Sequence, residues 1–241
     1  MKVFVAGAAG VVGRRLVLLL RQARHSVTGT TRSAGKAEAL RALGVEPVIV
    51  DVFDAPALHR ALAAARPDAV MHQLTDLPQD ADPKKIQAAL EGNARLRMDG
   101  TRNLVAAARA AGVRRLVAQS LAFVYAPGPK PYREDAPLHL AAEGVARRTV
   151  EGVAALEQAV TGAPDLDGVV LRYGRFYGPG TWSAQRSGEA PLHVDAAAQA
   201  ALLALTRGAP GIYNIAEDDG TVAIEKARRE LGFDPDFRIV A

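Results

Sequence analysis

The chain contains no cysteine among its 241 residues and few aromatic residues, 5% in all. Without cysteine, disulfide bonds, thiolate catalysis and zinc–thiolate sites are excluded. Long apolar runs are missing as well, because the stretch LVLLL at 16–20 is too short to span a membrane. The five histidines show no metal-binding spacing, so we expect no metal site. The chain starts on a strand-like segment and shows no signal peptide, which predicts a cytoplasmic protein that does not associate with membranes.

The charge is mildly basic, with 30 Lys and Arg against 26 Asp and Glu and a net charge of +4. These basic residues are scattered and occur at most in pairs, such as Arg14-Arg15 and Lys84-Lys85, without interleaved aromatic residues. That pattern is not typical of a nucleic-acid-binding surface, whereas a mildly positive surface suits an anionic cofactor. We therefore expect a small-molecule substrate and no nucleic acid, and the sequence leaves a monomer and a homodimer open.

Strand-like and helix-like segments alternate up to residue 120. The expected strands lie at 2–7, 25–32, 46–52, 67–74 and 113–120, and the helices between them at 11–23, 34–44, 55–65 and 83–112. Apolar strands that alternate with helices predict a parallel sheet covered on both faces, in a doubly wound α/β order. After a Pro-rich loop at 125–138 and a helix at 146–157, we expect a strand that runs into a Gly/Pro loop at 167–181, a helix at 193–208, a strand at 211–219 and a last helix at 221–233. We expect one domain over 1–241, with 165–241 contributing a small substrate-binding cap.

The first strand leads directly into GAAGVVG, whose three glycines occupy positions 7, 10 and 13. In this context Gly7 permits a tight turn, Gly10 lets the backbone approach a pyrophosphate, and Gly13 lets the helix pack close to the sheet. The following helix offers free N–H groups and the positive end of its dipole to phosphates. The motif predicts a dinucleotide site that includes Gly7, Ala9, Gly10, Val11, Val12 and Gly13.

The end of the second expected strand reads TGTTRS and contains no acid between Gly29 and Lys36. A carboxylate at this place would bind the ribose 2′-hydroxyl of NAD. Arg32 stands there instead, and a guanidinium suits a 2′-phosphate through charge-assisted hydrogen bonds. With hydroxyl groups from Thr31 and Ser33, the segment predicts NADP(H) as the preferred cofactor over NAD(H).

Later motifs extend the pattern over nearly the whole chain: MHQLT at 71–75, GTRNLVAAARAAGVRRLV at 100–117, SLAFVY at 120–125, LRYGRFYGPG at 171–180 and GIYNI at 211–215. Together with the glycine motif, the chain resembles the NAD-dependent epimerase/dehydratase group, the extended and atypical short-chain dehydrogenases/reductases. The resemblance implies a Rossmann fold and further cofactor contacts at Asp51, Val52, Gln73, Leu74, Thr75, Gln119 and Tyr173.

Departures from the family pattern fall on its catalytic residues. The catalytic Ser or Thr corresponds to Leu121, and the Tyr and Lys of the Tyr-x-x-x-Lys pair correspond to Thr149 and Val153. We call these three the relay positions, because in the family they move the proton. Arg97 and Arg175 replace two asparagines, and two insertions that usually form the substrate domain are strongly reduced.

Three functions remain open on the sequence alone. The first is an NADP(H)-binding reductase or epimerase-type enzyme with a non-standard proton donor, for which Tyr125 is our first choice and Ser120 its partner; Tyr132 and Tyr173 are other candidates. The second is a non-redox cyclase, isomerase or lyase that reuses the fold, and the third is a cofactor-sensing protein without catalysis. Thr149 and Val153 are predicted to be helix packing positions, since Val153 shares an apolar stripe with Val150.

Overall fold

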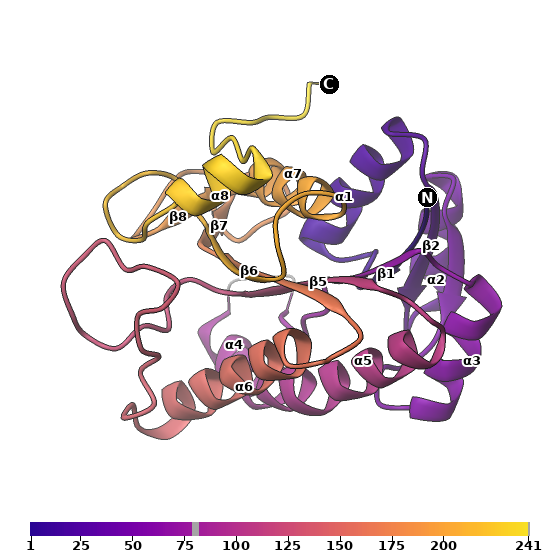
Figure 1. Ribbon diagram of the computed structural model, residues 1–241, viewed down its shortest axis with the longest axis horizontal. Coiled ribbons are helices and arrows are strands. Elements are labelled where there is room, and N and C mark those ends of the chain that lie inside the picture. The colour runs from indigo at the N-terminus through magenta and orange to yellow at the C-terminus, as the bar shows by residue number, and fades with distance from the viewer. Residues whose placement is uncertain (79–81, 241) are drawn as a thin grey trace.

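The computed structural model describes residues 1–78 and 82–240 and contains one parallel seven-stranded sheet (Figure 1). Its strand order is β3-β2-β1-β4-β5-β6-β9, and every neighbouring pair in it is parallel. The strands are β1 (Lys2–Ala6), β2 (Ser26–Thr31), β3 (Glu46–Ile49), β4 (Ala69–His72), β5 (Arg115–Leu121), β6 (Asp167–Tyr173) and β9 (Gly211–Ile215). The predicted doubly wound sheet is confirmed, and its order reverses direction between β1 and β4, where ligands bind in such sheets.

Helices cover both faces of the sheet, because the strands are apolar on both sides. In β1, Val3 and Val5 belong to one buried cluster and Phe4 and Ala6 to the other. The first cluster packs against α1 (Val11–Gln22), α2 (Ala34–Ala42), α7 (Val194–Ala204) and α8 (Glu225–Leu231), and the second against α3 (Ala55–Ala65), α5 (Thr101–Ala110) and α6 (Gly144–Thr161). In Figure 1 the α3, α5 and α6 layer lies below the sheet and the α1 and α7 layer above it.

The long helical region expected at 83–112 forms as three consecutive pieces. They are α4 (Pro83–Arg95), one π-helical turn η1 (Leu96–Gly100) and α5. None of the helices in the described part of the chain is long and apolar enough to cross a membrane.

The C-terminal range 165–241 supplies two strands of the main sheet, at the places where the sequence predicts strands. Both β6 and β9 are strands of the main sheet, and α7 belongs to its α1 layer. Outside the main sheet lie β7 (Arg175–Tyr177) and β8 (Pro191–His193), which pair parallel in a small second sheet, with the loops around them. The small substrate-binding cap within 165–241 stays a prediction, and β7, β8 and their loops are parts of this range that lie outside the main sheet.

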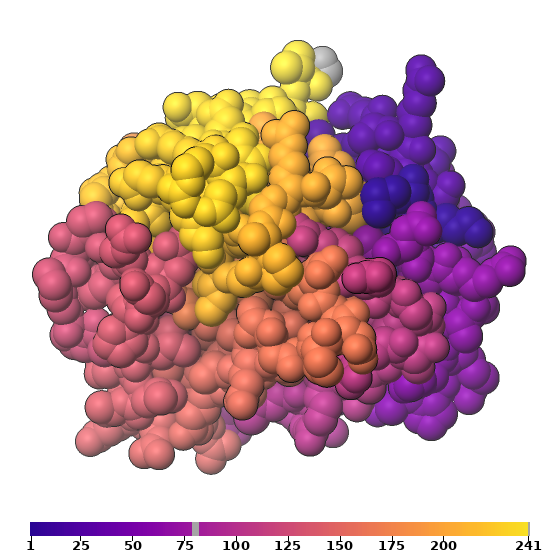
Figure 2. Space-filling model, in the orientation of Figure 1, coloured from indigo at the N-terminus to yellow at the C-terminus, as the bar shows by residue number. Residues whose placement is uncertain are grey.

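The Pro-rich loop after β5 is held against the C-terminal region. The Tyr132 N–H donates to the carbonyl of Thr221 over 2.9 Å, and the Ala223 N–H donates back to the carbonyl of Tyr132 over 2.9 Å. In the space-filling view this loop lies on the left of the molecule, beside the yellow C-terminal region (Figure 2). Two segments far apart in sequence thus form one wall at the carboxyl end of β5, β6 and β9.

Candidate dinucleotide and active site

The glycine turn, residues 7–13, joins β1 to α1 and is tightly closed at both ends. Gly7 has φ +89°, and a Cβ there would lie 2.5 Å from the Gln73 carbonyl oxygen. A Cβ on Gly13 would lie 2.1 Å from the carbonyl oxygen of Gly7. Neither position therefore accepts a side chain without a backbone shift, which agrees with the tight turn predicted at Gly7 and the close helix packing predicted at Gly13.

Gly10 is different, because the space above it is open. A Cβ there would meet only two atoms within 4 Å, the carbonyl oxygens of Gly7 at 3.2 Å and of Gln73 at 4.0 Å. Gly10 is the N-cap of α1, and that helix begins without a capping side chain and without an acid in its first turn. No side chain in the described part of the chain caps the first N–H groups of α1, which can therefore bind an anion. Val11 and Val12 begin this helix and Ala9 precedes it, so these residues fit a dinucleotide pyrophosphate.

Arg32 follows β2 and carries a partner that the sequence did not indicate. Its Nη2 lies 2.5 Å from Oδ1 of Asp76, and the two side chains are 58% and 45% exposed. Asp76 follows β4, and its own N–H donates to Oδ1 of Asn93 over 2.9 Å. Because β2 and β4 flank β1 in the sheet, the ion pair crosses the carboxyl end of β1, next to the glycine turn. The only sequence signal for it is an acid shortly after the fourth strand.

The neighbours of Arg32 are arranged as the start of a helix. Ser33 is the N-cap of α2, where its Oγ accepts from the Lys36 N–H over 3.4 Å, and the Ser33 N–H donates to Oγ1 of Thr31 over 3.2 Å. After β3, the carboxylate of Asp51 accepts from the Phe53 N–H, and Val52 is buried against Gly100. These residues border the same end of the sheet as the glycine turn.

The end of β4 is tied to β5 and to the helix layer below it. The Gln119 amide on β5 donates to the Leu74 carbonyl over 2.7 Å, and Thr75 beside it is exposed. His72 is buried, with Nε2 2.9 Å from Oγ1 of Thr101. Burial, together with the charge of Arg97, lowers the pKa of His72 to about 4, so this ring is neutral near pH 7.

Gln73 and Tyr173 lie on the other face of the sheet. Both polar atoms of the Gln73 amide are buried and have no hydrogen-bond partner among the described residues. The Tyr173 hydroxyl lies close to that amide but donates to the Ala197 carbonyl over 3.3 Å. Burial raises the pKa of Tyr173 well above its ordinary value, which disfavours this residue as an acid.

The relay positions offer no acid. Val153 is completely buried and packs with Val124 and Val150, and Leu121 lies against the same cluster. The packing role predicted for Val153 is confirmed. Thr149 is half-buried one turn earlier on α6. A lysine at 153 would place an unpaired ammonium in this apolar cluster, so the packing here is incompatible with the family's Tyr-x-x-x-Lys pair.

Ser120 and Tyr125, our candidate proton donors, both lie against one buried ion pair. Arg172 on β6 and Glu157 on α6 are 3% and 5% exposed and form two hydrogen bonds, at 2.8 Å and 2.7 Å. Ser120 donates to Oε1 of Glu157 over 2.8 Å. The Tyr125 hydroxyl accepts from Arg172 over 2.7 Å and donates to Oδ1 of Asn214 over 2.6 Å. The structure therefore brings the two candidates together, but gives both hydroxyls protein partners.

These contacts and the burial of the site shift the pKa values of Arg172 and Tyr125. Burial opposes the charged guanidinium, yet the hydrogen bonds and charge of Glu157 raise the pKa of Arg172 above its ordinary value. Burial also raises the pKa of Tyr125, against the opposing influence of Arg172 and Asn214. A raised pKa leaves the Tyr125 hydroxyl protonated and bound, which favours a structural role.

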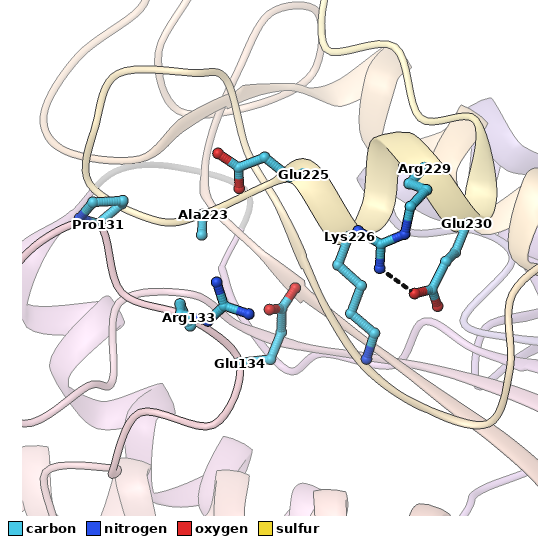
Figure 3. Close-up of a pocket in the computed structure, with 8 residues that line it drawn as sticks. All are labelled: Pro131, Arg133, Glu134, Ala223, Glu225, Lys226, Arg229 and Glu230. Carbon is cyan, nitrogen blue, oxygen red and sulfur yellow. Dashed lines mark hydrogen bonds and ion pairs between the residues drawn. The ribbon is translucent and has the colours of Figure 1, made fainter.

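A cavity of about 570 Å³ lies elsewhere, between the loop after β5 and α8 (Figure 3). Its walls carry both charge signs, and Lys226 in it already donates to the Ile212 carbonyl over 2.7 Å. None of the predicted cofactor residues lines this cavity. This cavity is therefore separate from the glycine turn, which follows β1.

The parallel sheet, the glycine turn and the open helix N-terminus define a dinucleotide-binding protein of the short-chain dehydrogenase/reductase class. A model of the NAD dependent epimerase/dehydratase family matches residues 3–191. A 3-diazoavenalumate denitrifying reductase from a Streptomyces species is 43% identical over 249 residues, which cover 93% of this chain and 79% of that protein. The chain belongs to the NAD-dependent epimerase/dehydratase family, a family of oxidoreductase and epimerase enzymes.

Solved structures show the same fold. UDP-glucose 4-epimerase of Thermotoga maritima, with UDP-glucose, has a TM-score of 0.78 at 18% identity, covering 99% of this chain and 94% of that one. UDP-glucose 4-epimerase of Thermus thermophilus, in complex with NAD, has a TM-score of 0.71 at 25% identity, covering 98% and 85%. At these identities the likeness concerns the fold and not the substrate.

Proposed function

We propose that the chain is an NADP(H)-dependent reductase of a small aromatic substrate that carries a diazo group, and that it works without the family's proton relay. The observation that carries the proposal is the combination of an open glycine turn beside Arg32 with relay positions that hold Leu121, Thr149 and Val153. The 43% identical relative, by its name a denitrifying reductase of a diazo compound, supports a reductase over an epimerase or a non-redox enzyme.

The cofactor would be held by groups on both sides of the sheet switch point. The N–H groups of α1 would bind the pyrophosphate, and Arg32 with Thr31 and Ser33 would bind the 2′-phosphate. Gln73, Leu74 and Thr75 would line the ribose and pyrophosphate side, and Gln119 would border the nicotinamide. When bound, the dinucleotide supplies a hydride. The residues proposed to contact it are Gly7, Ala9, Gly10, Val11, Val12, Gly13, Thr31, Arg32, Ser33, Asp51, Val52, Gln73, Leu74, Thr75, Gln119 and Tyr173.

The absence of a proton donor at the relay positions is consistent with an aromatic diazo substrate. Reduction of a carbonyl group leaves an alkoxide that needs a proton, which the family's tyrosine supplies. In the aryl diazonium ion, the cationic form of an aromatic diazo group, transfer of one hydride to the ring carbon forms a C–H bond, while the C–N bonding pair leaves with N₂. This second reaction needs no proton from the protein, so apolar side chains at the relay positions do not prevent it.

The cofactor preference is testable through the Arg32–Asp76 pair. We expect the unmodified protein to bind NADP(H) more tightly than NAD(H) in titration calorimetry. Arg32→Asp should narrow or reverse the preference, because it removes a charge-assisted contact worth about 1.5–3 kcal/mol.

Asp76→Asn should raise NADP(H) affinity by up to about fivefold, since an exposed ion pair worth about 0.2–1 kcal/mol no longer competes for Arg32. Equal affinity for both cofactors in the unmodified protein would contradict the assignment.

The proton donor is testable by two single substitutions. Thr149→Val should leave turnover nearly unchanged, because no proton passes through this position.

Tyr125→Phe should lower the free energy of unfolding by about 1–3 kcal/mol, since Asn214 and Arg172 lose a buried partner, but should change turnover only a few-fold. The alternative in which Tyr125, with Ser120 as its partner, donates the proton also stays a prediction, and it predicts a large loss of turnover in Tyr125→Phe. A loss of about a hundredfold in folded Tyr125→Phe would support that donor and count against the proton-free account.

A further inference from the structure

Arg97 is a buried cation, and one of its guanidinium nitrogens has no hydrogen-bond partner in the described part of the chain. Its side chain is 9% exposed, and its Nη1 is fully buried without a hydrogen-bond acceptor among the described residues. Asp99, two residues further along the chain, pairs with Arg102 and Arg95, and Asp76 pairs with Arg32. An unpaired buried charge lowers stability, so such a group is expected where a ligand completes it.

The helix that carries Arg97 places it under the segment that follows β4. Asn93, one turn before, accepts from the Asp76 N–H, and Thr101, one turn after, contacts the ring of His72. Both contacts fall on residues 72–76, so the helix face that Arg97 shares with Asn93 and Thr101 is turned toward that segment. Arg97 lies in η1, and single π-helical turns frequently mark functional sites.

The layers of the fold separate this cation from the phosphate site. The N-terminus of α1 belongs to the layer on one face of the sheet, whereas α5, directly after η1, packs on the opposite face. The donors proposed for the pyrophosphate and the 2′-phosphate are the N–H groups of α1 and Arg32. Arg97 would therefore be available to a different anion, which would approach the ends of β4 and β5.

We infer that Arg97 binds a carboxylate of the substrate and so selects aromatic acids over neutral aromatic compounds. The guanidinium presents donors that match a carboxylate, and its partly desolvated position strengthens the contact. Burial lowers the pKa of Arg97 only to about 10, so the group stays charged near pH 7. That the bound carboxylate belongs to an aromatic diazo substrate rests on the proposed function.

The test uses two unreactive probes, 3-aminobenzoate and the neutral 3-aminobenzamide, titrated into the protein saturated with NADP⁺. Arg97→Met should weaken 3-aminobenzoate binding about tenfold or more and leave 3-aminobenzamide binding unchanged. Arg97→Lys should retain part of the 3-aminobenzoate binding, because the ammonium group keeps the positive charge but lacks the paired donors of the guanidinium group. Arg102→Met is the matched control on the exposed side of the same helix and should bind both probes normally.

A second readout separates a ligand-binding role from a structural one. Arg97→Met should keep or raise the melting temperature, because it removes an unpartnered buried charge. Equal binding of 3-aminobenzoate by Arg97→Met and unmodified protein would overturn the inference, and so would a loss of NADP⁺ affinity without a loss of probe binding. Failure of the unmodified protein to prefer the acid over the amide would overturn it as well. Because the probes are not turned over, probe binding through Arg97 in a protein that reduces no diazo compound would overturn only the proposed function.

Discussion

Replacing Glu157 with alanine should lower the free energy of unfolding by about 3–5 kcal/mol, as measured by urea denaturation. The reason is that Arg172, 3% exposed, would keep its charge in the interior without a counterion. The Ser120 hydroxyl would lose its acceptor at the same time. The effect should be large because β5, β6 and α6 all meet at this ion pair.

Two control variants separate the charge from the packing. Ser120→Ala, which removes one neutral donor to the same carboxylate, should cost only about 0.5–1.5 kcal/mol. The double variant Glu157→Leu with Arg172→Met should regain most of the loss, since replacing both charges with apolar groups of similar size is often neutral. A loss below about 1 kcal/mol in Glu157→Ala would show that water or another group compensates Arg172.

Gly10→Ala should weaken dinucleotide binding by about 1–3 kcal/mol, or roughly five- to 150-fold, while the protein still folds. The added methyl group would occupy the open space above the turn, where the pyrophosphate is proposed to lie. Within the protein it would meet the Gly7 carbonyl oxygen at 3.2 Å, which a small local shift relieves. Calorimetry with NADP⁺, paired with a thermal melt, measures both effects.

Gly13→Ala is the contrasting variant in the same turn. Its Cβ would lie 2.1 Å from the Gly7 carbonyl oxygen, so the backbone itself must move and the melting temperature should fall clearly. The two variants thus separate a glycine kept for a ligand from a glycine kept for packing. Unchanged NADP⁺ affinity in a folded Gly10→Ala protein would show that the pyrophosphate does not approach this residue.

Local sequence patterns were sufficient to predict the parallel sheet and the conformation of the glycine turn. Apolar strands that alternate with helices leave few topologies, and Gly7, Gly10 and Gly13 have roles fixed by backbone sterics within seven residues. The resemblance to the family also identified the three relay positions, and Val153 is buried as its apolar stripe indicated.

Contacts between distant segments were not predictable in the same way. Arg32 with Asp76, and Arg172 with Glu157 and Tyr125, join residues whose neighbours depend on the final strand order. The sequence favoured Tyr125 as an acid because it follows a strand end, but it contained no sign that Arg172 and Asn214 would engage its hydroxyl. Likewise, the sequence predicts strands at 167–181 and 211–219, but it does not show that β9 pairs with β6 at the edge of the main sheet.

The most direct test of the central claim is a stoichiometric assay with NADPH and diazotised 3-aminobenzoate, a simple aryl diazonium acid. NADPH oxidation and N₂ release are followed together, with the protein-free reaction as the baseline. The account predicts one N₂ for each NADPH oxidised, at a rate well above the baseline, retained in Thr149→Val and strongly reduced in Gly10→Ala. NADPH that binds to the protein but is oxidised no faster than in the protein-free reaction would contradict it.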